Sequence, residues 1–232
     1  MKLNPLLLIV AIFVVLTIAL QVVAGSDLTP TNSLAQHDAS KWRKDIAAFE
    51  AADATNPPPR GCIVFTGSSY IRKWSTLATD FPGLPVVNRG FGGCHLADVY
   101  AYADRIVIPY APREVVLYAG GNDINSGMSS ELVFGDFVAV MTKLRQALPR
   151  AKIVFISCPP SPKRWAQTDT IKKVNGLIAR YCREHNLTFV DTFALMLGAD
   201  GQPKPDIYDK DQLHMNEAGY AIWRKAVAPF LK

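Results

Sequence analysis

Four polar segments of the sequence carry residue types that acyl-transfer chemistry requires. They are Gly67-Ser68-Ser69, NRGFGG (88–93), GGND (120–123) and DQLHMN (211–216). A serine hydroxyl becomes a good nucleophile only when a neighbouring base removes its proton. The negative charge that then forms on the substrate oxygen needs hydrogen-bond donors. The four segments together contain a candidate for each of these groups, and only the fold can bring them together.

Ser69 is the candidate nucleophile. It follows the apolar run Cys62–Thr66, which is typical of a strand, and precedes a sequence that reads as a helix start. At a helix N-terminus, backbone N–H groups and the helix dipole favour developing negative charge, and the N–H of Ser69 itself could serve an oxyanion hole. The alternative is that Ser68 or Ser69 only caps the helix.

His214 is the candidate general base, and Asp211 precedes it by three residues. On one turn, the Asp211 carboxylate can hold Nδ1–H of the imidazole while Nε2 faces the serine, which fixes the tautomer that a hydrolase needs. A surface turn can show the same spacing. His95 and Asp98 have it in reverse order, where capping of the next helix explains them equally well. His37 lies in a polar segment and is expected to be solvated.

Oxyanion donors are expected from Gly93 and Asn122 in the two glycine-rich segments. Gly93 can present a backbone N–H without a side chain in the way, and Asn122 offers a side-chain amide. Both segments could alternatively be simple tight turns, but the four segments together are more specific than any one of them. Side chains that flank the segments are candidates for substrate binding, with packing or surface ion pairs as the alternative; they are Tyr70, Arg89 and Phe91.

The elements that must position these residues alternate along the chain. Further strands are expected at Pro85–Asn88, Glu114–Ala119, Lys152–Ser157 and Thr188–Asp191, and helices at Leu96–Ile106, Glu131–Leu148, Thr170–His185 and Glu217–Leu231. Short apolar strands separated by helices indicate a parallel sheet covered on both faces, an α/β fold. Ligands of such sheets bind outside the carboxyl ends of the strands, where the candidate residues stand.

The bulk properties suit one α/β domain of 232 residues and exclude some functions. The net charge of +5 is mild and the basic residues are scattered, so no nucleic-acid partner is expected. No Cys or His spacing predicts a metal site, and no cofactor is expected. Cys62, Cys94, Cys158 and Cys182 permit three disulfide pairings, but their apolar surroundings favour free or partly paired thiols.

The N-terminus predicts export. Lys2 precedes an apolar run that ends in small residues near Ala24, as in a secretory signal peptide, although the run is also nearly long enough for an uncleaved membrane anchor. We therefore expect a signal peptide or anchor at residues 1–25, a linker at 26–39 and the folded domain at 40–232. The protein would be secreted, periplasmic or anchored, and would meet a membrane only through this segment.

In their order along the chain, the four segments resemble the motif blocks of the SGNH hydrolases, also called the GDSL esterase/lipase family. The resemblance runs from about Pro57 to the C-terminus, and the stretch from Gly67 to Gly93 looks like a bacterial, secreted-type branch. It implies a three-layer α/β/α sandwich with a flavodoxin-like parallel sheet of five strands. It also implies a catalytic triad of Ser69, Asp211 and His214, and an oxyanion hole formed by the Ser69 N–H, Gly93 and Asn122.

The first block departs from the family pattern, because Ser68 and Tyr70 stand where relatives carry Asp and often Leu. The triad is complete without that Asp, but the local hydrogen bonding of the nucleophile turn is left open. The second Gly of the G-x-S-x-G elbow is also absent, which argues against the α/β-hydrolase fold.

The activity expected from these residues is metal-free hydrolysis of carboxylic esters. No long apolar lid segment lies between the motifs, so short acyl groups such as acetyl are favoured, on a small-molecule ester or an acylated carbohydrate. A thioesterase or a lysophospholipase would use the same triad. A non-catalytic envelope- or carbohydrate-binding module is the alternative from another class, and it predicts a lost triad residue, whereas every position is filled. The oligomeric state is open.

Overall fold

The computed structural model describes residue 34 and residues 37–232, and the fold below is that of the unit Thr31–Lys232. The predicted export segment (1–25) and most of the predicted linker (26–39) lie outside the described residues. The first helical turn after them is η1 (Ala39–Trp42), which continues into α3 (Arg43–Thr55). No helix in the described part of the chain is both long enough and apolar enough to cross a membrane.

The sheet has five strands, all parallel, in the order β2-β1-β3-β4-β5. This is the flavodoxin-like order, so the predicted sheet is confirmed. The predicted strands agree with the observed ones within two residues at each end; these are β1 (Ile63–Gly67), β2 (Val86–Gly90), β3 (Glu114–Tyr118), β4 (Lys152–Ile156) and β5 (Thr188–Val190). Every residue of the central strands β1 and β3 is buried, as expected for strands built around the apolar runs at residues 63–65 and 115–117.

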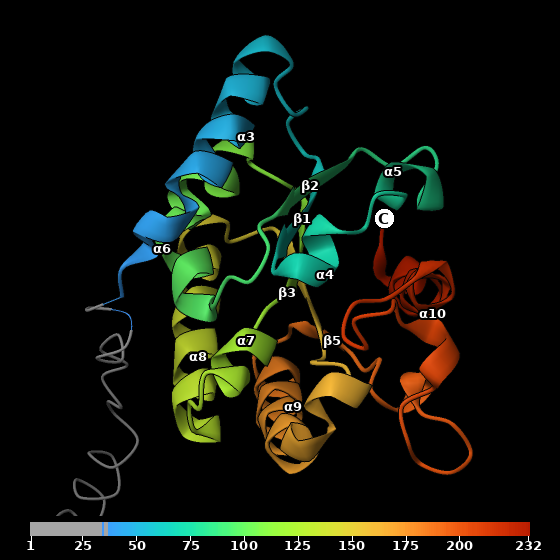
Figure 1. The fold of residues 1–232 in the computed structure, drawn as a ribbon. Coiled ribbons are helices and arrows are strands. Elements are labelled where there is room, and N and C mark those ends of the chain that lie inside the picture. Colours follow the sequence, from blue (N-terminus) through green and yellow to red (C-terminus); the bar gives the residue numbers. More distant parts are fainter. Residues whose placement is uncertain (1–33, 35–36) are drawn as a thin grey trace, which may run out of the picture. The chain divides into compact units, whose positions relative to one another are not determined.

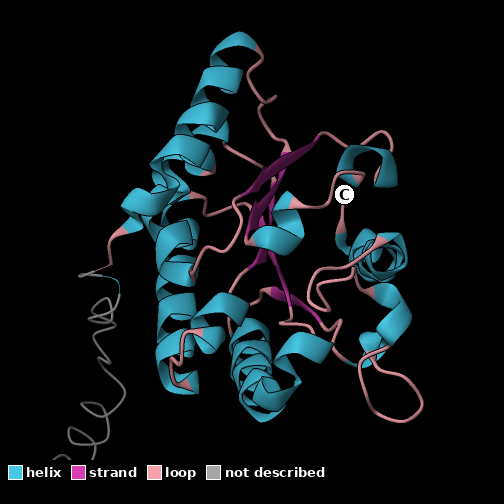
Figure 2. Ribbon diagram, in the orientation of Figure 1, coloured by secondary structure: helices cyan, strands magenta, loops and turns pink. Residues whose placement is uncertain are grey.

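Helices cover both faces of the sheet, so the predicted three-layer α/β/α sandwich is confirmed (Figures 1 and 2). On one side α3, α6, α8 and α9 pack against one another in that order, and α10 lies on the opposite side. The long helices are α6 (Leu96–Ile106), α8 (Ser130–Ala147), α9 (Thr168–Glu184) and α10 (Glu217–Val227). The short ones are α4 (Ser69–Arg72), α5 (Leu77–Asp80) and α7 (Gly121–Asn125).

The last helix is shorter than its apolar pattern predicts. It ends at Val227 and passes into the 3₁₀ turn η6 (Ala228–Phe230) instead of continuing to Leu231. Pro229 has no N–H to donate, so the α-helical ladder cannot continue through it.

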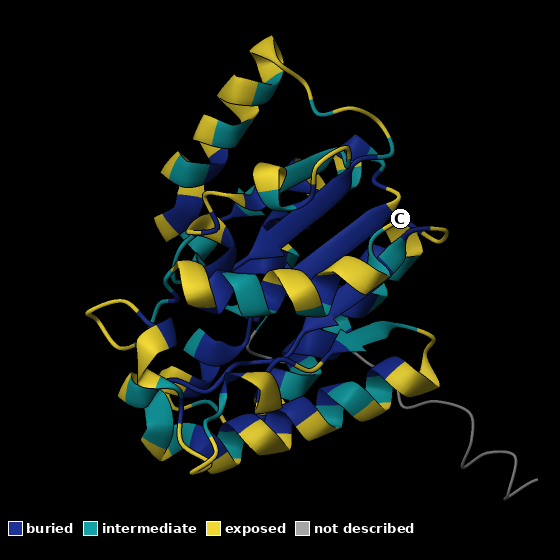
Figure 3. Cartoon of the chain, turned by 90° about the vertical axis from the view of Figure 1, so that its right-hand side faces the viewer, coloured by how far each residue is buried: buried dark blue, intermediate teal, exposed yellow. Residues whose placement is uncertain are grey.

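The core lies between the sheet and its helices, where strands are buried and helices turn one face to solvent (Figure 3). In α9 the buried apolar side chains recur at helical spacing, at Ile171, Val174, Ile178 and Cys182. All four cysteines are buried and free, as the apolar-segment interpretation predicts. The chain therefore holds its domain together by packing, without a disulfide among them.

Gly67 closes β1 and fixes the way the chain leaves the sheet. Its φ is +116°, and a Cβ added there would lie 1.9 Å from the carbonyl oxygen of Tyr118 on β3. The next residue, Ser68, donates its N–H to that same carbonyl at 2.9 Å. Only glycine permits this approach, so β1 and β3 stay paired up to the residue before the candidate nucleophile.

Candidate active site

The candidate site lies at the carboxyl ends of β1 and β3, where the strand order reverses direction. Ser69 begins α4, directly after β1, and its side chain is partly exposed. Because α4 is only one turn long, its dipole is small, and the N–H of Ser69 is the group that matters. Ser68 occupies the N-cap position but makes no capping hydrogen bond, so the capping alternative holds for neither serine.

His214 lies next to Ser69 although 145 residues separate them, with Nε2 2.9 Å from Ser69 Oγ. Asp211 Oδ2 lies 2.5 Å from His214 Nδ1. The carboxylate can only accept, so Nδ1 carries a proton and Nε2 is left to accept the serine proton. Sequence spacing predicts the Asp211–His214 pair, the family resemblance implies Ser69 as the third member, and the fold brings all three together.

Asp211 is held ionised by its own turn. Its Oδ1 accepts hydrogen bonds from the backbone N–H groups of Leu213 (3.0 Å) and His214 (2.9 Å). Burial raises the pKa of Asp211, but the hydrogen bonds from the His214 ring and from these two N–H groups outweigh it and leave the pKa well below its usual value. The carboxylate is therefore a permanent acceptor for the imidazole at neutral pH.

The turn that carries His214 is attached to the nucleophile's helix. The hydroxyl of Tyr70 donates to the carbonyl of Leu213 at 2.5 Å, and the Tyr70 ring lies against His214 with 5.8 Å between centroids. Burial raises the pKa of Tyr70 well above its usual value, so the hydroxyl remains a donor. Asn216 then caps α10 by accepting from the N–H groups of Ala218 and Gly219, which fixes the other end of the turn.

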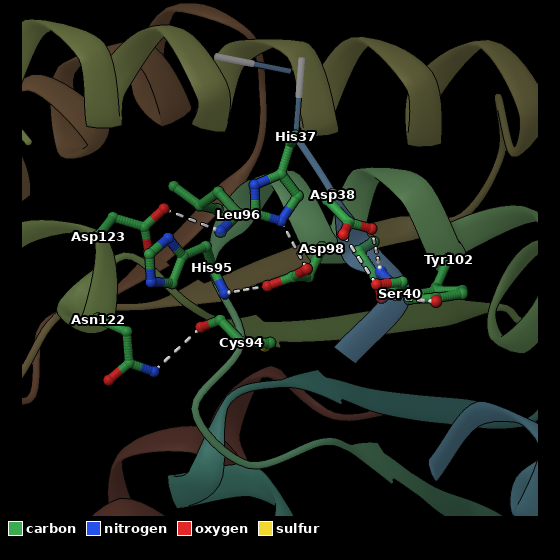
Figure 4. Close-up of polar contacts among 11 residues, drawn as sticks. His37, Asp38, Ser40, Cys94, His95, Leu96, Asp98, Tyr102, Asn122 and Asp123 are labelled. Carbon is green, nitrogen blue, oxygen red and sulfur yellow. Dashed lines mark hydrogen bonds and ion pairs between the residues drawn. The ribbon is translucent and has the colours of Figure 1, made fainter. Parts of the chain in front are cut away.

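Asn122 projects its side chain into the site from α7, directly after β3. Gly120 precedes it with a φ of +108°, which turns the chain sharply out of the sheet. The Asn122 amide donates from Nδ2 to Ser68 Oγ at 2.7 Å and to the carbonyl of Cys94 at 3.0 Å; Figure 4 draws the second of these bonds. Both amide hydrogens thus point toward the segments that carry Ser69 and Gly93.

Gly93 and Ser69 offer backbone donors. Gly93 has a φ of +84°, and a Cβ there would lie 3.4 Å from the ring of Trp42, so the position suits glycine. Within the described part of the chain, neither the Gly93 N–H nor the Ser69 N–H donates to a protein acceptor. These N–H groups remain free to bind a ligand, whereas the amide of Asn122 is already engaged.

The structure corrects the predicted substrate-binding side chains. Tyr70 is buried and holds the His214 turn, and Phe91 is fully buried against Trp42. Arg89 is bound to Asp53 and to the Tyr110 hydroxyl, at the outer edge of the sheet. None of the three presents a free side chain to a substrate at Ser69, because Tyr70 and Phe91 are packed in the core and Arg89 is held in an ion pair. The prediction is wrong for Tyr70, Arg89 and Phe91.

His95 and Asp98 form the helix cap that their spacing allows. His95 is the N-cap of α6, and Asp98 accepts its N–H at 2.8 Å in a capping box (Figure 4). The expectation that His37 is solvated is wrong, because its Nε2 lies 2.6 Å from the buried Asp98 carboxylate. Sequence spacing could not predict that contact, since 61 residues separate the two side chains.

Arg164 is a site residue that the sequence reasoning missed. It lies in η3 (Pro162–Gln167), after β4, and contacts Asn122 through its guanidinium group at 2.9 Å. The rule that ligands bind beyond strand ends applies to β4 as much as to β1 and β3, so the segment after β4 was also a candidate location for site residues. No motif marks an isolated arginine in a proline-rich loop.

The described residues support neither a metal site nor a cysteine nucleophile. No group of three or more His, Cys, Asp or Glu side chains there could hold a metal ion. Cys94, the cysteine beside the site, is fully buried, and burial raises the pKa of its thiol well above the usual value. A neutral, inaccessible thiol is a poor nucleophile, which leaves the Ser69 hydroxyl as the candidate.

Comparison with known proteins places these residues in a family. The chain matches the model of the GDSL-like lipase/acylhydrolase family over residues 59–222. It is 27% identical over 183 residues to the platelet-activating factor acetylhydrolase IB subunit alpha1 of Pongo abelii, covering 73% of this chain and 74% of that one.

Two solved structures share the fold. A GDSL-like lipase from Bacteroides thetaiotaomicron superposes with a TM-score of 0.68 at 22% identity, covering 80% of this chain and 96% of that one. An acetylxylan esterase from Geobacillus stearothermophilus, solved as a catalytic mutant, superposes with a TM-score of 0.60 at 16% identity, covering 74% and 94%. At these identities the likeness shows the fold alone.

Proposed function

The chain belongs to the GDSL-like lipase/acylhydrolase family, and from this premise we propose that it is a serine hydrolase of carboxylic esters with small acyl groups. Ser69 is the nucleophile, His214 the general base and Asp211 the carboxylate that orients it. One observation carries the proposal: Ser69 Oγ lies 2.9 Å from His214 Nε2, and His214 Nδ1 lies 2.5 Å from Asp211.

In the acylation step, Ser69 Oγ attacks the acyl carbonyl carbon while His214 Nε2 takes the hydroxyl proton. The carbonyl oxygen becomes an oxyanion, and the Ser69 N–H, the Gly93 N–H and the Asn122 amide are the donors that stabilise it. The intermediate then expels the alcohol, which receives the proton from His214. The ionised Asp211 stabilises the imidazolium that exists between these two proton transfers.

In the deacylation step, a water molecule replaces the alcohol. His214 takes a proton from the water, the hydroxide attacks the acyl ester of Ser69, and the same donors stabilise the second oxyanion. Collapse of this intermediate releases the carboxylic acid and returns the proton to Ser69. The overall reaction consumes one ester and one water and gives one alcohol and one acid.

Stabilising the oxyanion requires a change at Asn122. Its two amide hydrogens donate to Ser68 Oγ and to the Cys94 carbonyl before substrate arrives. A substrate oxyanion is a stronger acceptor than the neutral Ser68 hydroxyl, because hydrogen bonds to charged groups are the stronger ones. We expect the Nδ2–H that faces Ser68 to move to, or be shared with, the oxyanion.

Small acyl groups, acetyl above all, are the proposed substrates. Two similar proteins bear names that state acetyl removal, one an acetylhydrolase and one an acetylxylan esterase. Acetyl esters of small molecules, including acetylated carbohydrates, are therefore the first substrates to test. The predicted export of the chain would place it where extracellular or envelope esters occur.

The experiment is a substrate panel with the wild type and the Ser69→Ala variant. It contains p-nitrophenyl acetate, p-nitrophenyl palmitate, an acetylated xylo-oligosaccharide, an acetyl thioester and a lysophospholipid. We expect the wild type to hydrolyse the acetyl esters best and Ser69→Ala to retain no more than background activity. Undiminished hydrolysis by a folded Ser69→Ala variant contradicts the nucleophile, and preference for the palmitoyl ester, thioester or lysophospholipid contradicts the substrate class.

A further inference from the structure

Arg164 approaches the candidate oxyanion site from a segment outside the four motif blocks. This segment is linked to the turn that carries His214, because the N–H of Lys163 donates to the carbonyl of Gln212 at 3.0 Å. The Arg164 side chain is partly buried rather than solvated. The segment therefore contacts the turn that carries His214 through Lys163, and Asn122 through Arg164.

The guanidinium group of Arg164 binds two consecutive residues at the start of α7. Nη1 donates to the carbonyl of Gly121 at 2.9 Å, and Nη2 donates to Asn122 Oδ1 at 2.9 Å. A planar fork with fixed N–H directions suits two acceptors held at a fixed spacing, which the flexible ammonium of lysine does not reproduce. The contact therefore fixes both the backbone and the side chain of the oxyanion donor.

This contact and the Cys94 carbonyl, which can only accept, together decide which way the Asn122 amide faces. Arginine has donors but no acceptor, so the side of the amide that meets Arg164 must be the carbonyl oxygen. The NH₂ side then necessarily faces Ser68 and Cys94, as observed. With the amide turned over, two donors would meet at Arg164 and the oxyanion site would present an acceptor, which repels negative charge.

The charge of Arg164 also acts on the amide. A charge-assisted hydrogen bond to Oδ1 polarises the amide and strengthens donation from Nδ2. In the described part of the chain no carboxylate lies within ion-pair distance of Arg164. Its positive charge is thus not neutralised by a neighbouring carboxylate there, and it favours an oxyanion bound to Asn122.

We propose that Arg164 is a positioning residue of the oxyanion hole, which orients and polarises Asn122 through its two hydrogen bonds to Gly121 and Asn122. The proposal rests on the proposed ester hydrolysis and adds a residue to it. It predicts an effect on the transition state and little effect on binding of the neutral ester, because the oxyanion forms only after attack.

The test measures kcat and KM for p-nitrophenyl acetate in Arg164→Met, with Lys163→Met as the matched control. Lys163 is the exposed neighbouring cation, so the control removes the same charge without touching Asn122. We expect kcat of Arg164→Met to fall by about 10-fold to 100-fold with KM nearly unchanged, since outright loss of an oxyanion donor costs roughly 10²–10³. Lys163→Met should keep the wild-type kcat.

Coupling to Asn122 separates positioning from a merely structural role. In the Asn122→Ala background, Arg164→Met should reduce kcat by less than about twofold, because residues that act through one another are not additive. In Arg164→Gly, guanidinium chloride below denaturing concentrations should raise kcat several-fold, and it should not do so in Lys163→Gly. If Arg164→Met does not fold, the test uses Arg164→Lys and the guanidinium rescue of Arg164→Gly instead. The kcat of Arg164→Lys should then lie between those of wild type and Arg164→Gly.

Three results overturn the proposal. They are an unchanged kcat in a folded Arg164→Met, a loss confined to KM, and a full additional loss in the Asn122→Ala background. The proposed function fails separately, through a folded wild type that neither hydrolyses the ester panel nor reacts with a fluorophosphonate probe, and the role of Arg164 fails with it. A wild type that hydrolyses the ester while Arg164→Met does so equally well contradicts the role of Arg164 alone.

Discussion

At the scale of single residues, the two serines after β1 have different partners. Ser69 Oγ faces His214 Nε2, whereas the buried Ser68 Oγ accepts a hydrogen bond from Asn122. Sequence reasoning could separate them only by the position of Ser69 in the motif. The partner of Ser68 depends on a side chain 54 residues away, which no local pattern encodes.

Asp211→Asn tests the carboxylate of the proposed triad. An amide in that place favours the wrong tautomer of His214, so we expect kcat to fall by about 10³–10⁴-fold with a small change in KM. Stability should change little, since the Asp211 side chain is more than one-third exposed. Steady-state kinetics and a thermal melt measure both.

The control for Asp211→Asn is Asp209→Asn, an exposed carboxylate on the same turn. It removes a charge of the same sign close to His214 and should retain near wild-type kcat. A loss of similar size in both variants would show that net charge on the turn, rather than the hold on Nδ1, is responsible.

At the scale of elements, the site depends on how β1 and β3 end. Short continuous apolar runs predicted the strands, and apolar residues at helical spacing predicted the long helices. Of the one-turn helices α4 and α7, only the helix start at Ser69 was predicted, because single turns have too little pattern to detect. They are the elements that carry Ser69 and Asn122, so the local geometry of the site had to come from the structure.

Gly67→Ala tests the end of β1. A methyl group there would overlap the backbone of Tyr118 and strain a φ of +116°, so we expect little or no folded protein. Gly83→Ala is the matched control, since Gly83 has a φ of +79° and open space around it.

The Gly83 variant should lose only about 1–2 kcal/mol of unfolding free energy, the cost of a left-handed non-glycine residue. Urea denaturation of both variants measures the difference. Equal losses would mean that conformational strain alone matters and that the β1–β3 approach tolerates a side chain.

At the scale of the whole domain, a buried carboxylate on α7 binds the start of α6. Asp123 is fully buried next to Asn122, and its Oδ1 accepts the N–H of Leu96 at the start of α6 (Figure 4). Burial raises the pKa of Asp123 to about 6, and the nearby Asp136 on α8 adds to the increase. The burial of Asp123 and its raised pKa could not be predicted from the sequence, because an Asp after Gly-Gly-Asn also suits an exposed turn.

A pH dependence of stability follows from the raised pKa of Asp123. Between its usual value of 3.8 and about 6, the folded protein holds a proton that the unfolded chain releases, so raising the pH through this window destabilises the fold. Asp123→Asn removes this loss. The unfolding free energy of Asp123→Asn minus that of wild type should therefore be larger at pH 7 than at pH 4, by on the order of 2 kcal/mol.

Urea denaturation at the two pH values measures this difference, with the exposed Asp169→Asn as control. In that control the difference from wild type should be the same at both pH values. An equally flat result for Asp123→Asn would indicate that Asp123 ionises normally in the folded protein.

The most direct test of the central claim is to identify which residue a fluorophosphonate probe modifies. The probe phosphonylates a serine only when a base activates it, so intact mass and peptide mapping should find one adduct on Ser69 in the wild type. The Ser69→Ala and His214→Ala variants should remain unmodified while keeping the wild-type melting temperature within a few degrees. An adduct on Ser68, or no adduct on a folded wild-type protein, would contradict the assignment of Ser69 as the activated nucleophile.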